Sequence, residues 1–259
     1  MANICVIPAR MQSTRFPGKP LRELLGLPLV LHIYHRCRLC DSLDRVVIAT
    51  CDEEIRRVGE AAGAEVVMTA DTHPGCVDRT SEAIDLIGGD LADDDLVLMV
   101  QGDEVLVAPD MLTEMIAAHA AKMPPVVNLI SRLYRDEDRN DPNCVKVVSA
   151  PDGTAIYFSR SPIPSFHHAE DSSACVTYQQ TGVIGFSKAF VKTFGTLART
   201  PIEKTERIDM MRVVEHGLPI VCVATETETL GVDTPEDLRR AEGLLRDTPV
   251  TATYLDTST

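Results

Sequence analysis

The stretch Ile-Cys-Val-Ile-Pro-Ala-Arg-Met-Gln-Ser-Thr-Arg-Phe-Pro-Gly-Lys-Pro occupies residues 4–20 of the chain. Its apolar start, Ile4 to Ile7, predicts a buried strand that ends at Pro8. The loop that follows is cationic, because the first 22 residues contain four cations, Arg10, Arg15, Lys19 and Arg22, and no acidic residue. We therefore predict a loop that binds a polyanion, with a triphosphate as the main candidate and a solvated basic loop as the alternative.

The rest of the chain is acidic, with 39 Asp and Glu against 25 Lys and Arg in 259 residues, and a net charge of -14. A general nucleic-acid or membrane-surface role is not expected, since both need a basic face. No apolar run reaches the roughly 20 residues of a membrane span, and the start lacks the charged segment of a signal peptide. The eight scattered cysteines are typical of reduced thiols, so we expect a cytoplasmic protein. Cys37 and Cys40 form a lone CxxC motif, which is half a zinc site, a redox pair or, as we favour, two ordinary helix residues.

Short apolar runs alternate with helical patterns, which predicts βαβ units on a mixed, mostly parallel sheet. Residues 1–247 are expected to form one α/β domain, in which 125–190 is a small antiparallel insertion serving the acceptor side or a subunit contact. Residues 248–259 are expected to be a frayed, flexible tail. In such sheets ligands bind outside the carboxyl ends of the strands, where the loops 8–19, 69–78 and 101–105 would meet. Strands are predicted at 3–7, 45–50, 64–68, 96–101, 125–131, 143–149, 154–158, 181–186 and 219–224, and helices at 28–40, 52–63, 79–88, 109–122, 187–195, 205–216 and 235–246.

Two aspartates are candidate metal ligands. Asp103 follows the apolar run 97–101, and an acid at the end of a parallel strand is suited to hold Mg²⁺ against nucleotide phosphates. The alternative is a turn that Asp103 caps. Asp233 precedes a helix start in which Thr234 is the N-cap and Pro235 the first helical residue. Asp233 is not needed for that cap, so it is free to complete a two-carboxylate site with Asp103.

The blocks Pro-Ala-Arg-Met-Gln-Ser-Thr-Arg-Phe-Pro-Gly-Lys-Pro-Leu, Gln-Gly-Asp-Glu, Asp-Pro-Asn-Cys-Val-Lys-Val-Val, Tyr-Phe-Ser-Arg-Ser-Pro-Ile-Pro and Gly-Val-Asp-Thr-Pro-Glu-Asp-Leu resemble, in order, those of the 3-deoxy-manno-octulosonate cytidylyltransferases (CMP-KDO synthetases). The resemblance covers most of residues 3 to 246. It implies a Rossmann-like nucleotidyltransferase fold, CTP as donor, Mg²⁺ as cofactor and a homodimer. It also implies catalytic roles for Arg15, Lys19 and Asp103, metal binding by Asp103 and Asp233, and an acceptor carboxylate on Arg160. The implied CTP contacts are Pro8, Ala9, Arg10, Ser13, Arg15, Lys19, Asp78, Arg79 and Gln101.

The chain departs from the family pattern in two places. Near the base, the family's Ser-Gly-Thr-Glu-Arg is replaced by Gly-Cys-Val-Asp-Arg at 75–79. On the acceptor side, the family's His and Tyr are Gln180 and Ile184, and its Glu-Gln is Asp209-Met210. A sugar acid needs many paired hydrogen bonds, and each buried group left unpaired costs about 1–3 kcal/mol.

These changes favour a smaller and more highly charged acceptor, held by Arg160, Gln180, Ile184, Lys204, Arg207 and Asp209. By analogy with enzymes of phosphonate biosynthesis that resemble the same family, we expect phosphonoformate or a similar carboxylated phosphonate. The alternatives are 3-deoxy-manno-octulosonate or a related 2-keto-3-deoxy sugar acid and, in another class, a catalytically silent nucleotide-binding regulatory protein. The expected reaction is in-line attack of an acceptor oxygen on the α-phosphorus of CTP with release of pyrophosphate.

Overall fold

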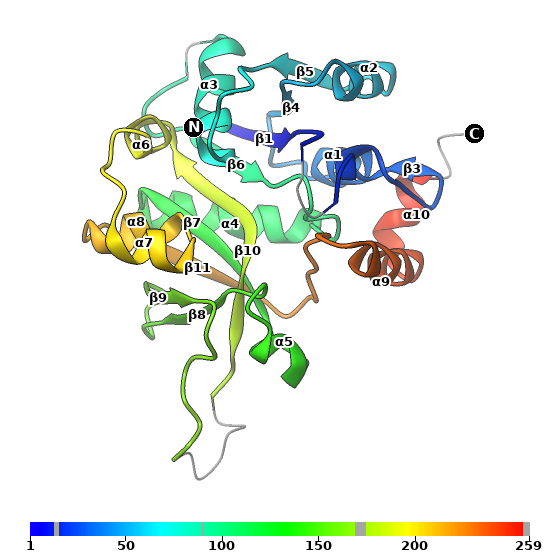
Figure 1. The fold of residues 1–259 in the computed structure, drawn as a ribbon. Coiled ribbons are helices and arrows are strands. Elements are labelled where there is room, and N and C mark those ends of the chain that lie inside the picture. The colour runs from blue at the N-terminus through cyan, green and yellow to red at the C-terminus, as the bar shows by residue number, and fades with distance from the viewer. Residues whose placement is uncertain (13–15, 90, 169–174, 256–259) are drawn as a thin grey trace.

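A computed structural model describes residues 1–12, 16–89, 91–168 and 175–255. Figure 1 shows a central sheet with helices on both of its faces. One face is covered by α1 (Leu29–Arg38), α4 (Pro109–Lys122) and α9 (Pro235–Arg246), whose apolar side chains join the larger buried core. The other face is covered by α3 (Cys76–Leu86), α6 (Lys188–Phe194) and α8 (Met210–Glu215). The sheet is therefore buried on both sides, as its continuous apolar runs predict.

The remaining elements follow the predicted alternation of strands and helices. The long strands are β1 (Asn3–Ala9), β4 (Arg45–Thr50), β6 (Leu96–Val100), β7 (Val126–Arg132), β10 (Tyr178–Ser187) and β11 (Ile220–Thr225). The short ones are β2 (Glu23–Leu24), β3 (Leu27–Pro28), β5 (Glu65–Met68), β8 (Lys146–Ser149) and β9 (Ala155–Ser159). The other helices are the 3-10 turn η1 (Lys19–Leu21), α2 (Glu53–Ala61), α5 (Asp136–Asn140), α7 (Pro201–Glu206) and α10 (Pro249–Leu255).

The sheet has the strand order β11-β7-β10-β6-β1-β4-β5. The pairs β1–β4, β1–β6, β4–β5 and β7–β11 are parallel, so the carboxyl ends of β1 and β6 open on the same edge. The one reversed strand of this path, β10, runs antiparallel to both β6 and β7. Strands β8 and β9 pair antiparallel beside β10, which confirms the antiparallel character of the predicted insertion.

The single helix predicted at 205–216 is wrong, because the chain forms two short helices there. Helix α7 begins at Pro201 and ends where Arg207 adopts a left-handed backbone with φ 56°. Helix α8 then begins at Met210. A left-handed residue cannot continue an α-helix, so Arg207 reverses the chain at the cavity described below.

The flexible tail predicted at 248–259 is also wrong for residues 249–255, which form α10. Thr251 and Tyr254 are buried, with 3% and 4% of their surfaces exposed. Tyr254 stacks on His35 of α1 with ring centroids 5.6 Å apart, so tertiary packing orders a segment with few good helix formers. Residues 256–259 lie outside the described part of the chain. Among the described residues, no helix has both the length and the apolar character needed to cross a membrane.

Candidate active site

The carboxyl ends of β1 and β6 lie side by side and begin the site. β6 ends at Val100, and the chain then passes through Gln101 and Gly102 to Asp103. A Cβ atom at Gly102 would lie 3.0 Å from the Pro8 carbonyl oxygen, which is tighter than ordinary contact. Glycine at this position therefore lets the Gln-Gly-Asp-Glu turn approach the backbone of β1, and it brings Asp103 next to the cationic loop.

One ammonium group joins the two predicted metal ligands. The Lys19 Nζ atom lies 2.9 Å from Asp103 Oδ2 and 3.2 Å from Asp233 Oδ1. The three side chains are only 11%, 23% and 29% exposed. Burial alone would lower the pKa of Lys19, but the neighbouring carboxylates of Asp103 and Asp233 raise it above its ordinary value. Lys19 therefore stays protonated and holds two like charges together.

The backbone brings these three residues together by local rules. Gly18, in a left-handed conformation with φ 72°, ends the loop and starts η1 at Lys19. The Val232 N–H donates to the Asp103 carbonyl oxygen at 3.1 Å, which ties the segment before α9 to the turn after β6. The Thr234 cap of α9 is confirmed, since its hydroxyl accepts from the Asp237 N–H at 3.1 Å. The Asp233 backbone N–H joins this cap by donating to Asp237 Oδ2 at 3.1 Å, whereas its carboxylate, as predicted, takes no part in the cap and pairs with Lys19.

Two carboxylates that share one cation have the donor chemistry of a Mg²⁺ site completed by water and phosphate oxygens. No cluster of three or more His, Cys, Asp or Glu side chains suited to a metal occurs among the described residues. The residues present therefore fit the partial protein shell typical of nucleotide-bound Mg²⁺, and they do not fit a metal held by protein ligands alone.

Glu104, the next residue along the chain, is a functional candidate that the sequence reasoning missed. Its carboxylate is buried and accepts a hydrogen bond from the Gly182 N–H of β10. Burial, followed by the charge of Asp103, raises the pKa of Glu104 to about 7. The sequence did contain a signal for Glu104. Successive side chains of an extended chain point in opposite directions, so two adjacent acids after a buried strand are expected to lie in different environments.

A cavity of about 1260 Å³ opens beside this cluster. It reaches from the turn before α3 to the α7–α8 connection and is large enough for a nucleotide and an acceptor together. The predicted site residues that line it are Asp78, Gln101, Asp103, Arg160, Gln180, Ile184, Lys204, Arg207, Asp209 and Asp233.

Other predicted CTP contacts do not line the cavity, although Lys19 touches its edge through Asp103 and Asp233. Pro8, Ala9, Arg10, Lys19 and Arg79 are not among the described residues that line the cavity. Arg79 is only 3% exposed, and its guanidinium donates to Thr69 Oγ1 and, at 3.5 Å, to Cys51 Sγ. It therefore braces the loop after β5, and its contact with CTP stays a prediction. Ser13 and Arg15 fall outside the described residues.

The acceptor end of the cavity differs from a pocket rich in free hydrogen-bonding groups. Ile184 is 1% exposed and packs in the core. The Gln180 Nε2 atom donates to Asn128 Oδ1 at 2.8 Å, so its amide is partly occupied. Arg160 donates from Nε to Glu206 O at 2.7 Å, with further bonds to the carbonyls of Pro142 and Arg207. Two of its five N–H groups remain for an acceptor carboxylate.

Charges at this end have two signs. Lys204 and Arg207 line the cavity from the end of α7. Asp209 lies two residues further on, and burial raises the pKa of its carboxyl above the ordinary value. The cations here attract an anion, and the carboxyl of Asp209 lies close to them at the same end of the cavity.

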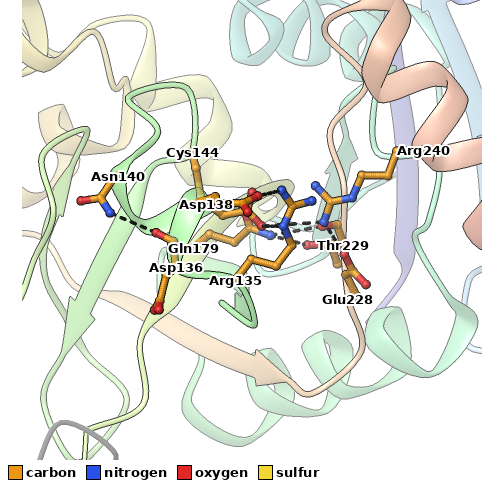
Figure 2. A network of polar contacts seen from close by, with 10 residues as sticks. Arg135, Asp136, Asp138, Asn140, Cys144, Gln179, Glu228, Thr229 and Arg240 are labelled. Atoms are coloured by element: carbon orange, nitrogen blue, oxygen red, sulfur yellow. Dashed lines mark hydrogen bonds and ion pairs between the residues drawn. The ribbon is translucent and has the colours of Figure 1, made fainter.

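A polar network closes the rim on the insertion side (Figure 2). Arg240 of α9 lies 3.7 Å from Asp138 of α5 and also pairs with Glu228. Gln179 of β10 donates to the Thr229 carbonyl oxygen at 3.2 Å and accepts from Cys144 Sγ at 3.0 Å. These contacts connect the insertion to the segment that leads to Asp233.

Hydrogen bonds from a buried lysine, Lys146, support the same insertion. The side chain of Lys146 is fully buried, and its Nζ atom donates to the carbonyls of Asp141, Cys144 and Arg160 at 2.7, 2.5 and 2.7 Å. Lys146 therefore fixes the backbone beside the predicted acceptor residue Arg160.

Residues 4–226 match the family model described as cytidylyltransferase. Three curated relatives are similar over most of the chain. A 3-deoxy-manno-octulosonate cytidylyltransferase of Thermodesulfovibrio yellowstonii is 37% identical, with 95% of this chain and 98% of that protein covered. One of Syntrophotalea carbinolica is 40% identical, over 95% and 99% of the two chains. An 8-amino-3,8-dideoxy-manno-octulosonate cytidylyltransferase of Shewanella pealeana is 36% identical, over 93% and 97%.

A solved structure agrees with these relatives. CMP:2-keto-3-deoxy-manno-octonic acid synthetase complexed with CTP superposes with a TM-score of 0.85 at 27% identity, over 95% of this chain and 99% of that one. The predicted nucleotidyltransferase fold is thereby confirmed. Sequence, fold and the cluster of Lys19, Asp103 and Asp233 agree, and the chain belongs to the cytidylyltransferase family as a CTP-dependent nucleotidyltransferase related to the 3-deoxy-manno-octulosonate enzymes.

Proposed function

We propose that this enzyme transfers CMP from CTP to a 2-keto-3-deoxy sugar acid of the octulosonate class and releases pyrophosphate. The observation that carries the proposal is the Lys19–Asp103–Asp233 cluster beside a cavity of about 1260 Å³. The curated relatives named above support this acceptor class over phosphonoformate, which the sequence alone favoured.

The chain's own residues do positioning and charge work in this proposal. The cationic loop with Lys19 binds the triphosphate and neutralises the leaving pyrophosphate. An acceptor oxygen forms a bond to the α-phosphorus while the bond between that phosphorus and the bridging oxygen of the β-phosphate breaks. Asp103 and Asp233 would hold Mg²⁺, which when bound screens the charge on the reacting phosphate. Gln101, which lies in the turn between β6 and Asp103, contacts the nucleotide.

The insertion supplies the acceptor side. In this proposal the two remaining N–H groups of Arg160 bind the acceptor carboxylate, while its other donors fix it to the carbonyls of Pro142, Glu206 and Arg207. The Ile184 side chain offers no hydrogen bond and the Gln180 amide donates to Asn128. Partners for the sugar hydroxyls would therefore come from other polar residues that line the cavity, such as Asn143, Thr181 and Thr229. We further propose that the enzyme works in a reducing, cytoplasmic setting, because all eight cysteines are free thiols. The homodimer implied by the family resemblance is part of the same proposal.

A second candidate acceptor is phosphonoformate or a similar carboxylated phosphonate. Lys204 and Arg207 at the cavity favour it, since a compact dianion gains from two cations and needs no hydroxyl partners. The two acceptors also differ in proton balance. A sugar hydroxyl must lose a proton during transfer, which passes to water or to the leaving pyrophosphate, whereas an ionised carboxylate or phosphonate oxygen has none to lose.

The test is pyrophosphate release from CTP or ATP with Mg²⁺ and each acceptor: 3-deoxy-manno-octulosonate, its 8-amino analogue and phosphonoformate. The proposal expects the highest kcat/KM with CTP and an octulosonate. Turnover with phosphonoformate alone would establish the second candidate. Binding of CTP without release by any acceptor would instead favour a catalytically silent regulatory protein.

A further inference from the structure

Two charged or titratable side chains are completely buried behind the active site, where no substrate reaches. His32 and Arg36 lie one turn apart on α1 and are 0% and 1% exposed. Such groups are retained in a core only when every polar atom has a partner, so their partners indicate what they hold.

His32 joins the C-terminal helix to the cationic loop. Its Nε2 atom lies 2.8 Å from the Leu24 carbonyl oxygen, and its Nδ1 atom lies 2.7 Å from the Tyr254 hydroxyl. Since a carbonyl only accepts, Nε2 carries the proton and donates, and Nδ1 accepts from Tyr254. Burial lowers the pKa of His32, which keeps this neutral form. Leu24 lies five residues after Lys19 and just after η1.

Arg36 joins the same helix to the turn after β6. Its Nε atom donates to the Val107 carbonyl oxygen at 2.5 Å and its Nη2 atom to that of Leu106 at 3.4 Å. Its Nη1 atom donates to Thr251 Oγ1 of α10 at 3.2 Å. Leu106 lies three residues after Asp103, in a turn closed by the Val107 N–H bond to the Glu104 carbonyl oxygen.

We propose that α10 is a positioning element of the active site, acting through Tyr254–His32 on the Lys19 loop and through Thr251–Arg36 on the Asp103 turn. The two loops carry the ends of the 2.9 Å Lys19–Asp103 pair, and α1 holds both from behind. Without Thr251 and Tyr254, His32 and Arg36 would each have an unmatched buried atom, and both would shift. Neither α10 residue is among the described residues that line the cavity. This inference rests on the proposed transfer reaction for its kinetic readout only.

A purely structural role for α10 makes a different prediction from a positioning role. It would lower the unfolding temperature but leave the rate of the folded molecules unchanged. A positioning role lowers kcat at temperatures where the protein is fully folded, because displacements of about 1 Å in a catalytic group reduce rates by up to roughly 100-fold.

The experiment compares Tyr254→Phe and Thr251→Val with Thr251→Ser, which keeps the hydroxyl, and with Thr253→Val on the exposed face of the same helix. We expect kcat to fall on the order of 10-fold in the first two, with the KM for the acceptor unchanged. Thr251→Ser and Thr253→Val should keep the wild-type kcat. If all four folded variants keep the kcat of the wild type, the proposal is overturned.

Hydrogen exchange provides a readout that does not depend on the acceptor. Tyr254→Phe and Thr251→Val should raise amide exchange in residues 19–28 and 100–108 by about 10-fold, and exchange in β4 should not change. Deleting 249–259, which removes α10, should raise exchange in the same two segments. Unchanged exchange in both segments would refute positioning even if the proposed reaction itself proved wrong.

Discussion

Replacing Lys19 by Met tests whether its ammonium group substitutes for a metal ion. In the structure Nζ lies 2.9 and 3.2 Å from the two carboxylates. At an effective dielectric constant of about 20, each unit-charge pair at about 3 Å is worth roughly 5 kcal/mol before desolvation is subtracted. Removing one partner from a buried pair costs about 3–5 kcal/mol. Asp103 and Asp233 are 23% and 29% exposed, so water recovers part of that cost. We therefore expect the free energy of unfolding of Lys19→Met to be about 2 kcal/mol lower than that of the wild type.

The second half of the prediction concerns Mg²⁺. In Lys19→Met the two carboxylates lack a competing cation, so Mg²⁺ should bind more tightly and stabilise the variant more than the wild type. A concentration ten times the dissociation constant adds about 1.4 kcal/mol. The assay is urea unfolding with and without Mg²⁺ in the absence of nucleotide. Turnover should be lost in this variant, because the triphosphate and pyrophosphate lose their point charge.

The matched control is Lys192→Met. Lys192 pairs with Asp85, whose side chain is 65% exposed, and such pairs contribute about 0–1 kcal/mol. Its Mg²⁺ response should equal that of the wild type. If Lys19→Met is as stable as the control and gains no more from Mg²⁺, the ammonium does not occupy a cation site between Asp103 and Asp233, and the metal assignment fails.

Three further predictions concern single groups. Asp103→Asn should lower kcat on the order of 10³-fold in a protein that still folds, and full activity would exclude Asp103 as a catalytic ligand. Lys146→Met leaves three carbonyls without their donor and should lower the free energy of unfolding, measured in urea, by about 3 kcal/mol. A change below about 0.5 kcal/mol would show that these three hydrogen bonds do not stabilise the fold. Burial would raise the pKa of Glu203, but the hydrogen bonds that its carboxylate accepts from Arg212 hold this pKa below its ordinary value of 4.5. The stability that Glu203 contributes is therefore full above about pH 4.5 and lost as the pH falls through the lowered pKa, so Glu203→Gln and the wild type should converge in acid.

The strand pattern and the closeness of Asp103 and Asp233 could be predicted, the first from local sequence and the second from the order of strands and helices. The apolar runs at 3–7, 45–50 and 96–101 match β1, β4 and β6, and parallel pairing brings their carboxyl ends together. Asp103 and Asp233 are far apart in the chain but both adjoin that edge. Their convergence followed from topology alone.

Other features depend on tertiary contacts that no local pattern reports. Arg207 adopts φ 56° without being glycine or asparagine, so nothing in the sequence separates α7 from α8. The segment with Thr251 and Tyr254 has weak helix propensity, and buried partners on α1 make it helical. Arg79 kept the family pattern, yet its guanidinium is directed into the fold, because side-chain direction depends on the packing of the β5–α3 loop.

The position of β10 has a consequence for synthesis on the ribosome. Residues 1–100 complete β6, β1, β4 and β5, but the outer edge of β6 pairs only with Val183 to Ser187. At about 5–20 residues per second, that edge stays unpaired for roughly 4–17 s while the intervening 87 residues are made, as 187 − 100 gives. All five β6 residues are apolar, so the nascent chain exposes an unpaired, aggregation-prone strand edge during this interval. Slower translation should therefore increase aggregation of this protein, and β10 is the segment whose arrival ends that risk.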